Sequence, residues 1–265
     1  MNRLHAEEFL KKKSRFVPYI MAGDPSAESS IDIALTLQEA GVDALEWGVP
    51  FSDPLADGPV IQAAGDRART AGMNIIVAID SIKEARHRGL TIPVILFTYI
   101  NPVLAHGEDV ILAKMNEADI DGILIPDLPI EESNTVKQLC KQYGKSLISL
   151  VTLNSESRLQ KIAKESDGFL YFVSSLGVTG TRENFAENLS QSIKDVKALT
   201  TVPVLVGFGI SKKEHVQFFT DVSDGVIVGS ALVKYIGERS SALQDENEKE
   251  NAINEIKEFV LELIS

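Results

Sequence analysis

Hydrophobic residues gather in eight short runs along the chain, each seven residues long. Within a run the apolar residues are almost continuous and do not alternate strictly with polar ones. This pattern is typical of parallel strands that are covered on both faces. The sequence therefore predicts eight buried strands, at residues 16–22, 42–48, 93–99, 121–127, 146–152, 168–174, 203–209 and 224–230.

Amphipathic segments with helix signals separate these runs. Ser211 and Glu214 have the spacing of a capping box, in which two side chains satisfy free backbone N–H groups reciprocally. Residues 2–13 and 252–264 predict a helix near each end of the chain. The alternation of strands and helices is typical of a parallel sheet built from repeated strand–helix units.

Eight such units in 265 residues fit a closed (β/α)8 barrel, the TIM-barrel fold, and we expect residues 1–265 to form a single domain. An open, doubly wound sheet is the alternative, but the regular units and the lack of an early GxGxxG motif favour the barrel. The long gaps at residues 49–92 and 175–202 predict long loops after strands 2 and 6. Both loops would lie at the carboxyl ends of the strands, where barrel active sites are built.

Composition and charge restrict the class of protein. The net charge of −12 argues against nucleic acid or an anionic membrane surface as a partner. No apolar run approaches the ~20 residues of a membrane-spanning helix, and the N-terminus lacks the apolar segment of a signal peptide. The single cysteine, Cys140, lies on the apolar face of residues 131–143 and fits a reducing compartment. We therefore expect a cytoplasmic protein with Cys140 in its core.

A glutamate stands near the end of the second predicted strand. Alternation along residues 44–48 turns Glu46 toward the barrel axis, whereas Leu45 and Trp47 point to the helices. A carboxyl group there loses solvation, which raises its pKa and suits it to proton transfer near neutrality. The alternative is a structural ion pair, but the eight runs contain no Lys or Arg. Glu46 is therefore the candidate general acid–base.

A second carboxylate, Asp57, lies eleven residues later in a loop rich in Pro and Gly. Aspartates in such loops commonly form turns or cap helices. The spacing alone does not decide between that structural function and catalysis.

Glycines follow the last two predicted strands, within residues 207–211 and 229–233. Glycine lets backbone N–H groups approach a phosphate closely, and helix N-termini favour anions. The loops after strands 7 and 8 form the recurrent phosphate site of TIM barrels. A phosphate could therefore be bound without a basic patch, which agrees with the negative net charge.

Metal and Schiff-base chemistry are not expected. The four histidines have no ligand spacing among them, and no lysine stands at a strand end where it would face the barrel axis. Cleavage of a carbon–carbon bond would then depend on carboxylates and on a substrate that acts as its own electron sink.

Five segments together carry a family resemblance: PYIMAGDP at 18–25, LEWGVPFSDPLADGP at 45–59, GVTG at 177–180, GFGIS at 207–211 and GSA at 229–231. On these segments the sequence resembles the α subunit of tryptophan synthase over essentially the whole chain. The resemblance implies a TIM barrel that cleaves indole-3-glycerol phosphate to indole and glyceraldehyde 3-phosphate, with no cofactor in this chain. Glu46 would be the general acid–base, and Asp57 would accept a hydrogen bond from the indole N–H.

The resemblance also implies the residues that surround the substrate and the partner. Those at the substrate would be Tyr19, Phe97, Tyr99, Tyr171, Thr179, Gly180, Phe208, Gly209, Gly229 and Ser230. The partner would be a β subunit that carries pyridoxal phosphate and receives indole through a tunnel, in an α2β2 assembly. It would contact the segments around Asp53, Asn101 and Pro129.

Two positions depart from the family pattern: Trp47, where a smaller aliphatic residue is expected, and Ser175, where some relatives carry arginine. Two other hypotheses stay open for the chain. It could be a lyase that is fast without a partner, or a non-catalytic protein that binds and activates the β subunit. Another phosphate-binding barrel, such as an isomerase of the histidine or tryptophan pathways, is a more distant hypothesis.

Overall fold

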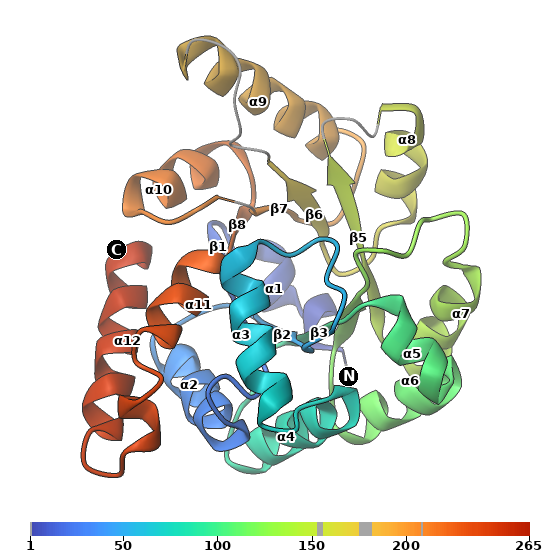
Figure 1. The fold of residues 1–265 in the computed structure, drawn as a ribbon. Coiled ribbons are helices and arrows are strands. Elements are labelled where there is room, and N and C mark those ends of the chain that lie inside the picture. Colours follow the sequence, from blue (N-terminus) through green and yellow to red (C-terminus); the bar gives the residue numbers. More distant parts are fainter. Residues whose placement is uncertain (1, 153–155, 175–181, 208) are drawn as a thin grey trace.

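The computed structural model describes the chain apart from residues 1, 153–155, 175–181 and 208. In the described part, eight parallel strands close into one barrel, each strand bonded to the next and β8 to β1 (Figure 1). The strands are β1 (Arg15–Met21), β2 (Leu45–Gly48), β3 (Val94–Phe97), β4 (Gly122–Leu124), β5 (Ser146–Thr152), β6 (Leu170–Val173), β7 (Val204–Gly207) and β8 (Gly225–Val228). The predicted closed barrel is confirmed, and the open sheet is excluded.

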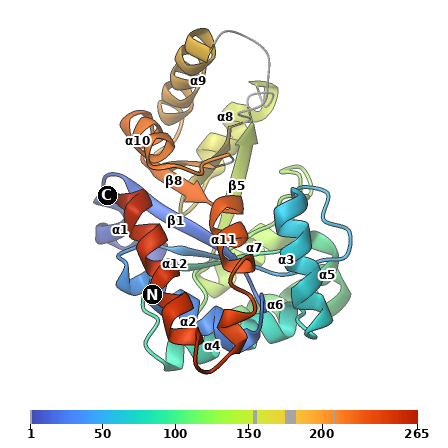
Figure 2. The ribbon, with the colours of Figure 1, turned by 60° about the vertical axis from the view of Figure 1, so that its left-hand side comes forward.

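Helices surround the barrel and connect its strands. They are α2 (Ala27–Glu39), α3 (Pro59–Thr70), α4 (Ile75–His87), α5 (Ile100–His106), α6 (Glu108–Glu117), α7 (Asn134–Tyr143), α8 (Glu156–Glu165), α9 (Arg182–Lys197), α10 (Lys213–Val222), α11 (Ser230–Gly237) and α12 (Lys249–Ile264), with the 3-10 turn η2 (Ala242–Gln244) before α12. The closing helix α12 packs beside α2 and α11 (Figure 2). The expected loop after β2 is present at residues 49–58. After β6, residues 175–181 lie outside the described residues, and α9 occupies most of the rest of the predicted gap.

Three boundaries differ from the sequence prediction. The segment expected as one helix over residues 2–13 is a 3-10 turn, η1 (Arg3–His5), followed by α1 (Glu7–Lys11), because Ala6 between them is extended. The capping box at Ser211 is wrong: α10 has Lys212 at its N-cap, so Ser211 lies one residue too early. Six of the eight strands, all but β1 and β5, are shorter than the predicted apolar runs, because residues beyond the strand, such as Ala44, are also buried.

The core has an inner layer within the barrel and an outer layer between strands and helices. Ala44 and Ile95 belong to the inner cluster, whereas Leu45 and Trp47 belong to the outer one. Since side chains alternate along a strand, Glu46 shares the inward face with Ala44. The predicted orientation of β2 is confirmed, and Trp47 contributes to packing against helices.

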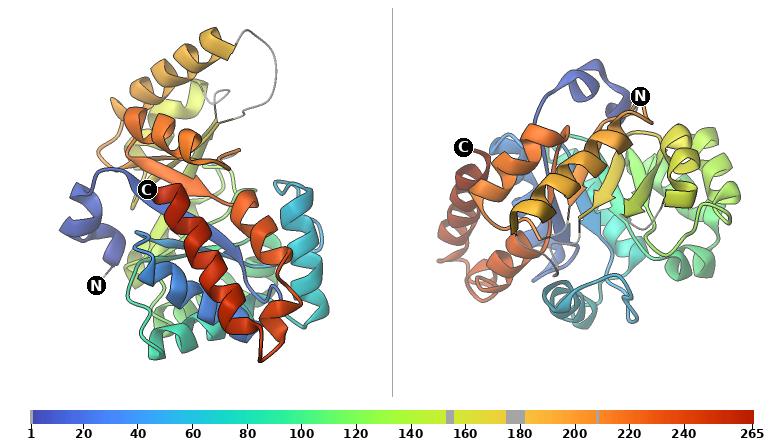
Figure 3. Two further views of the ribbon diagram at one scale, coloured as in Figure 1. Left: turned by 90° about the vertical axis from the view of Figure 1, so that its left-hand side faces the viewer. Right: turned by 90° about the horizontal axis from the view of Figure 1, so that it is seen from above.

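The N-terminal segment closes the amino end of the barrel. Leu4 of η1 and Phe9 of α1 join the inner cluster, and this segment lies on the opposite side of the barrel from α3 (Figure 3, left). β1 begins one residue earlier than predicted, at Arg15, so the expectation that no strand contains a cation is wrong. The buried Arg15 guanidinium donates to the carbonyls of Phe9 and Leu10, at 2.7 and 2.6 Å. It therefore stabilises the amino end and does not face Glu46, which pairs in register with Tyr19.

Candidate active site

A cavity of about 290 Å³ opens at the carboxyl ends of the strands. It brings together side chains from β1, β2, β3, β6 and β8 with the loop after β2 and the segments after β7 and β8. Its lining consists of Tyr19, Glu46, Ala56, Asp57, Gly58, Ile61, Phe97, Tyr171, Gly209, Ile210, Ser211, Ile227, Gly229, Ser230 and Ala231. Both candidate carboxylates thus face one space, although they come from a strand and a loop.

Glu46 has no Lys or Arg beside it among the described residues that line this cavity. Its side chain comes from the inward face of β2 and is 1% exposed. Among the described residues, its Oε1 atom has no hydrogen-bond partner. Burial raises the pKa of Glu46 to about 8, because it removes the ionised carboxylate from the water that would solvate it. The carboxyl group is therefore largely protonated at neutral pH and can still give up its proton there.

Asp57 is placed by turns in the loop and by the start of α3. Its N–H donates to the carbonyl of Pro54 at 3.2 Å, and its carbonyl accepts from Gln62 Nε2 at 2.7 Å. Gly58 then caps α3, with Pro59 in the first turn. Burial raises the pKa of Asp57 to about 6, against a smaller opposite effect of a hydrogen bond from Tyr99. Asp57 is therefore mostly ionised at neutral pH, whereas Glu46 is mostly protonated.

Tyr99 supports the loop after β2. The family resemblance implies that it packs on the substrate; among the described residues it is not part of the cavity lining. Its ring stacks on Phe51 at 5.2 Å between centroids. Its hydroxyl accepts the N–H of Ala56 at 3.0 Å and donates to the Asp57 carboxylate. Tyr99 therefore holds the loop that carries Asp57.

Two tyrosines cross the cavity next to glycines on neighbouring strands. A Cβ on Gly48 would come within 2.0 Å of the Tyr19 hydroxyl, and one on Gly207 within 2.2 Å of the Tyr171 hydroxyl. The absence of side chains at these strand ends therefore makes room for both rings. Phe97 meets the Tyr19 ring edge to face at 5.4 Å. Together these rings form an aromatic wall beside Glu46.

The opposite end of the cavity is formed by backbone after β7 and β8. Gly209 has a φ of 79°, a conformation that side chains other than glycine rarely adopt. Gly229 caps α11, and Ser230 is its first residue. No Lys or Arg stands among the described lining residues. An anion at this end would be bound by backbone N–H groups and a hydroxyl, as the sequence predicts.

Some predicted site residues lie outside the described part of the chain: Thr179, Gly180 and Phe208, together with the atypical Ser175. Conversely, sequence reasoning missed two apolar walls of the cavity, Ile61 and Ile227. Ile227 stands two residues before Gly229, so the alternation of β8 already indicates an inward side chain. Ile61 lies in the first turn of α3, and only the path of the preceding loop reveals that it faces the cavity.

The three residues expected at a partner interface are all exposed. Asp53 follows β2, Asn101 is in α5 after β3, and Pro129 follows β4. The loops after consecutive parallel strands lie at one end of a barrel, so these residues share its carboxyl face. Two large apolar side chains of the same segments are also exposed, Leu55 at 82% and Leu104 at 55%. Sequence reasoning did not single out either leucine.

The described residues contain neither a cluster suited to a metal ion nor a helix suited to cross a membrane. No group of three or more His, Cys, Asp or Glu residues in that part is arranged to hold a metal ion. None of the helices described is both long and apolar enough to cross a membrane. Cys140 is buried in the outer core, as predicted, and burial raises the pKa of its thiol to about 12.

Comparisons with known proteins agree with this geometry. Residues 6–262 match the family model described as "Tryptophan synthase alpha chain". The chain is 49% identical to the tryptophan synthase alpha chain of Halalkalibacterium halodurans, and the match covers 96% of both chains. It is 50% identical to that of Bacillus subtilis, and this match covers 93% of this chain and 92% of the relative. It is also similar to a chain in the structure of the tryptophan synthase complex from Pyrococcus furiosus, with a TM-score of 0.81, 35% identity, and coverage of 96% of this chain and 98% of the other. The chain therefore belongs to the tryptophan synthase alpha chain family.

Proposed function

We propose that Glu46 and Asp57 carry out, in this chain, the lyase reaction of its family, the cleavage of indole-3-glycerol phosphate to indole and glyceraldehyde 3-phosphate. The observation that carries the assignment is the buried Glu46 carboxyl group in the same cavity as Asp57, with its Oε1 atom lacking a hydrogen-bond partner among the described residues. A group that must both donate and accept a proton works best when its pKa lies near the working pH. The raised pKa of Glu46, about 8, meets that requirement.

The proposed reaction begins with proton transfer from Glu46 to ring carbon C3 of the indole. The ring becomes a cationic indolenine, and its N–H donates to the ionised Asp57. The bond between C3 and the glycerol chain then breaks, and its electron pair returns to the ring to restore indole. The hydroxyl on the released carbon gives its proton to the Glu46 carboxylate and becomes the aldehyde. Glu46 ends protonated, so no external oxidant or base is consumed.

The rest of the cavity fits the other parts of this substrate. Tyr19, Phe97 and Tyr171 offer flat apolar walls to an indole ring. We assign the phosphate to the end formed by Gly209, Gly229 and the start of α11. Backbone N–H groups at a helix N-terminus bind phosphate without basic side chains, which suits a cavity whose described lining has none.

The test is indole release from indole-3-glycerol phosphate, measured with and without a tryptophan synthase β subunit. If indole release is slow alone and faster with the β subunit, the chain is a catalytic subunit that depends on its partner, as proposed. Equally fast release in both cases supports a stand-alone lyase instead. No indole in either case, together with acceleration of the β reaction, indicates a non-catalytic activator and contradicts the assignment of Glu46 and Asp57.

Tyr99 is proposed as a positioning residue, which leads to a prediction for Tyr99→Phe. The variant keeps the ring on Phe51 but loses the hydroxyl that binds Ala56 and Asp57. Because that hydrogen bond lowers the pKa of Asp57, its loss should raise this pKa above about 6 and move the acid limb of the kcat profile to higher pH. We expect kcat at neutral pH to fall by about tenfold, the effect of one lost hydrogen bond to a charged group.

The matched control for Tyr99→Phe is Tyr143→Phe. Tyr143 on α7 also donates its hydroxyl to an aspartate, Asp109 at 3.1 Å, but lies outside the cavity. Its pH profile should match that of the wild type. If Tyr99→Phe lowers kcat without moving the acid limb, the hydroxyl does not act through Asp57.

A β subunit that carries pyridoxal phosphate is the proposed partner, in an α2β2 assembly. The complex from Pyrococcus furiosus supports a complex of this kind. The exposed Leu55 and Leu104 lie beside Asp53 and Asn101, on the segments expected at the interface. Apolar side chains so exposed on the face that carries the site suit burial by another protein.

Leu55→Asp is expected to weaken binding of a β subunit by at least tenfold, without loss of folding. Burying a leucine is worth about 2 kcal/mol, and an aspartate would in addition have to be desolvated. Titration calorimetry with the β subunit measures this change. Leu261→Asp on α12 is the control, since Leu261 is also exposed, at 43%, but lies on another segment. Equal affinities of the two variants would remove Leu55 from the interface.

A further inference from the structure

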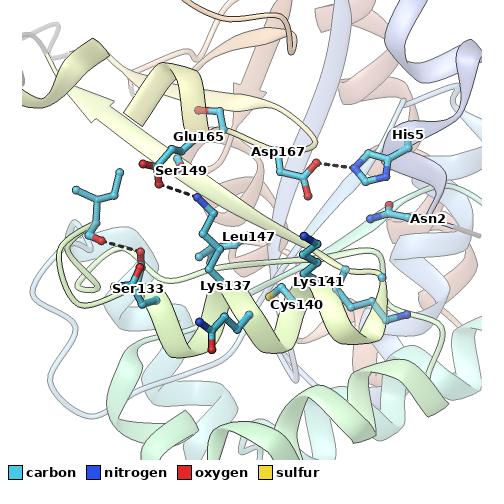
Figure 4. A pocket seen from close by; sticks show the side chains of 16 residues that line it. Asn2, His5, Ser133, Lys137, Cys140, Lys141, Leu147, Ser149, Glu165 and Asp167 are labelled. Carbon is cyan, nitrogen blue, oxygen red and sulfur yellow. Dashed lines mark hydrogen bonds and ion pairs between the residues drawn. The ribbon is translucent and has the colours of Figure 1, made fainter. Parts of the chain in front are cut away.

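A larger cavity, of about 890 Å³, lies outside the barrel between α7 and α8 (Figure 4). Its floor is the outward face of β5, where Leu147 and Ser149 are only half-buried. Helix α7 forms one wall, the end of α8 and the residues after it form the other, and Asn2 and His5 stand at one end. We call this cavity the α7–α8 groove. It shares no lining residue with the active-site cavity.

The two carboxylates of the groove are already paired. Lys137 Nζ on α7 lies 2.7 Å from Glu165 Oε2 at the end of α8 and so joins the two walls. His5 Nε2 lies 2.6 Å from Asp167 Oδ1. Figure 4 shows both contacts as dashed lines. Each carboxylate of the described lining thus already has a direct partner.

Two lysines of the groove lack such a partner. Within the described part of the chain, the side chains of Lys141 and Lys145 form no hydrogen bond or ion pair. Lys141 is exposed at the end of α7, whereas Lys145 is only 9% exposed. Lysine is seldom buried without a counter-ion because its ammonium group is costly to desolvate. Lys145 is therefore a buried cation beside a large cavity.

The carboxylates that act on Lys145 from a distance are engaged elsewhere. Asp119 pairs with Arg3, and Asp121 pairs with both Arg3 and Arg86. Burial outweighs the attraction of these aspartates and lowers the pKa of Lys145. The groove thus has a local excess of positive charge, although the chain as a whole has a net charge of −12.

We propose that the α7–α8 groove binds a small organic anion with an apolar body. Its charged group would pair with Lys145 and Lys141, and its body would lie on the partly uncovered floor at Leu147 and Ser149. The cavity volume falls in the range of sites for small organic ligands, about 300–1,000 Å³. A bound anion would give Lys145 a direct counter-charge, which the described residues do not supply.

Two fluorescent probes with the same ring system test the proposal. 1-Anilinonaphthalene-8-sulfonate carries a negative charge, and N-phenyl-1-naphthylamine does not. Each is titrated into the full chain with excess glycerol 3-phosphate present to occupy the phosphate end of the active site. We expect one site for the sulfonate, with an affinity at least tenfold higher than that of the uncharged probe.

Variants then locate the site. Lys145→Met should lower the affinity for the sulfonate about tenfold and leave the affinity for the uncharged probe unchanged. Ser149→Phe fills the floor of the groove without changing any charge and should weaken binding of both probes. It locates the site if Lys145→Met does not fold. The control Lys164→Met removes an exposed lysine of α8 outside the groove lining. Equal affinity of the two probes, or unchanged binding in the groove variants, would each overturn the proposal.

Discussion

Glu46→Gln is expected to lower kcat for indole release by about 10³-fold or more, the upper part of the range for loss of a general acid–base. Glutamine has nearly the same volume and can donate a hydrogen bond, but it cannot transfer a proton to C3 of the indole. The loss should therefore fall on the transition state and leave substrate affinity largely unchanged. Steady-state assays with a β subunit give kcat, and a direct binding titration of the variant gives the affinity.

The two measurements together separate catalysis from folding. A variant that binds substrate normally but does not release indole has kept the cavity and lost the proton transfer. If Glu46→Gln turns over at near wild-type rate, Glu46 is not the acid–base and the mechanism is wrong. If both affinity and kcat collapse, Glu46 acts on binding rather than on the transition state.

Asp57→Asn is expected to lower kcat by about 10²-fold, because a neutral amide stabilises the cationic indolenine less than a carboxylate does. The wild-type chain should also lose activity below pH 6, since an acid whose pKa is raised to about 6 is ionised only above that pH. Asparagine does not titrate, so this acid limb should be absent from the variant. A pH profile of kcat for both proteins measures the two effects.

Asp66→Asn is the matched control for Asp57→Asn. Asp66 is an exposed aspartate on the nearby helix α3, paired with Arg69 at 3.0 Å and outside the cavity lining. This variant should keep the wild-type kcat and acid limb. An acid limb that persists in Asp57→Asn would assign the titration to another group.

The barrel could be predicted because its strands are covered on both faces. Such strands are apolar throughout, so eight runs separated by helix-length segments indicated the closed sheet. The first and last residues of each strand were harder to predict, because burial extends beyond the hydrogen-bonded ladder. Arg15 was missed for a related reason: its charge placed it outside the apolar run, although backbone carbonyls satisfy its guanidinium inside the barrel.

The candidate site also contains residues that could be predicted and residues that could not. Glu46 could be predicted because strand alternation alone turns it inward, and its burial then follows. Asp57 could not be assigned from spacing, since its position depends on the turns at Pro54 and Gly58 and on the Tyr99 hydroxyl. The hydrogen bond of Tyr99 could not be predicted, because its partner is a loop N–H group whose location no sequence pattern specifies. Residues on regular elements were thus predictable, and residues defined by the path of a loop were not.

Burial at the end of β2 holds the Glu46 carboxyl group protonated near neutrality. The most direct test is the pKa of this side chain, measured by carbon-13 NMR on protein labelled at the glutamate carboxyl groups. The signal of Glu46 is identified by its absence from Glu46→Gln. We expect it to titrate with a pKa near 8. A pKa between about 4 and 5, the range of ordinary exposed glutamates, would contradict the claim.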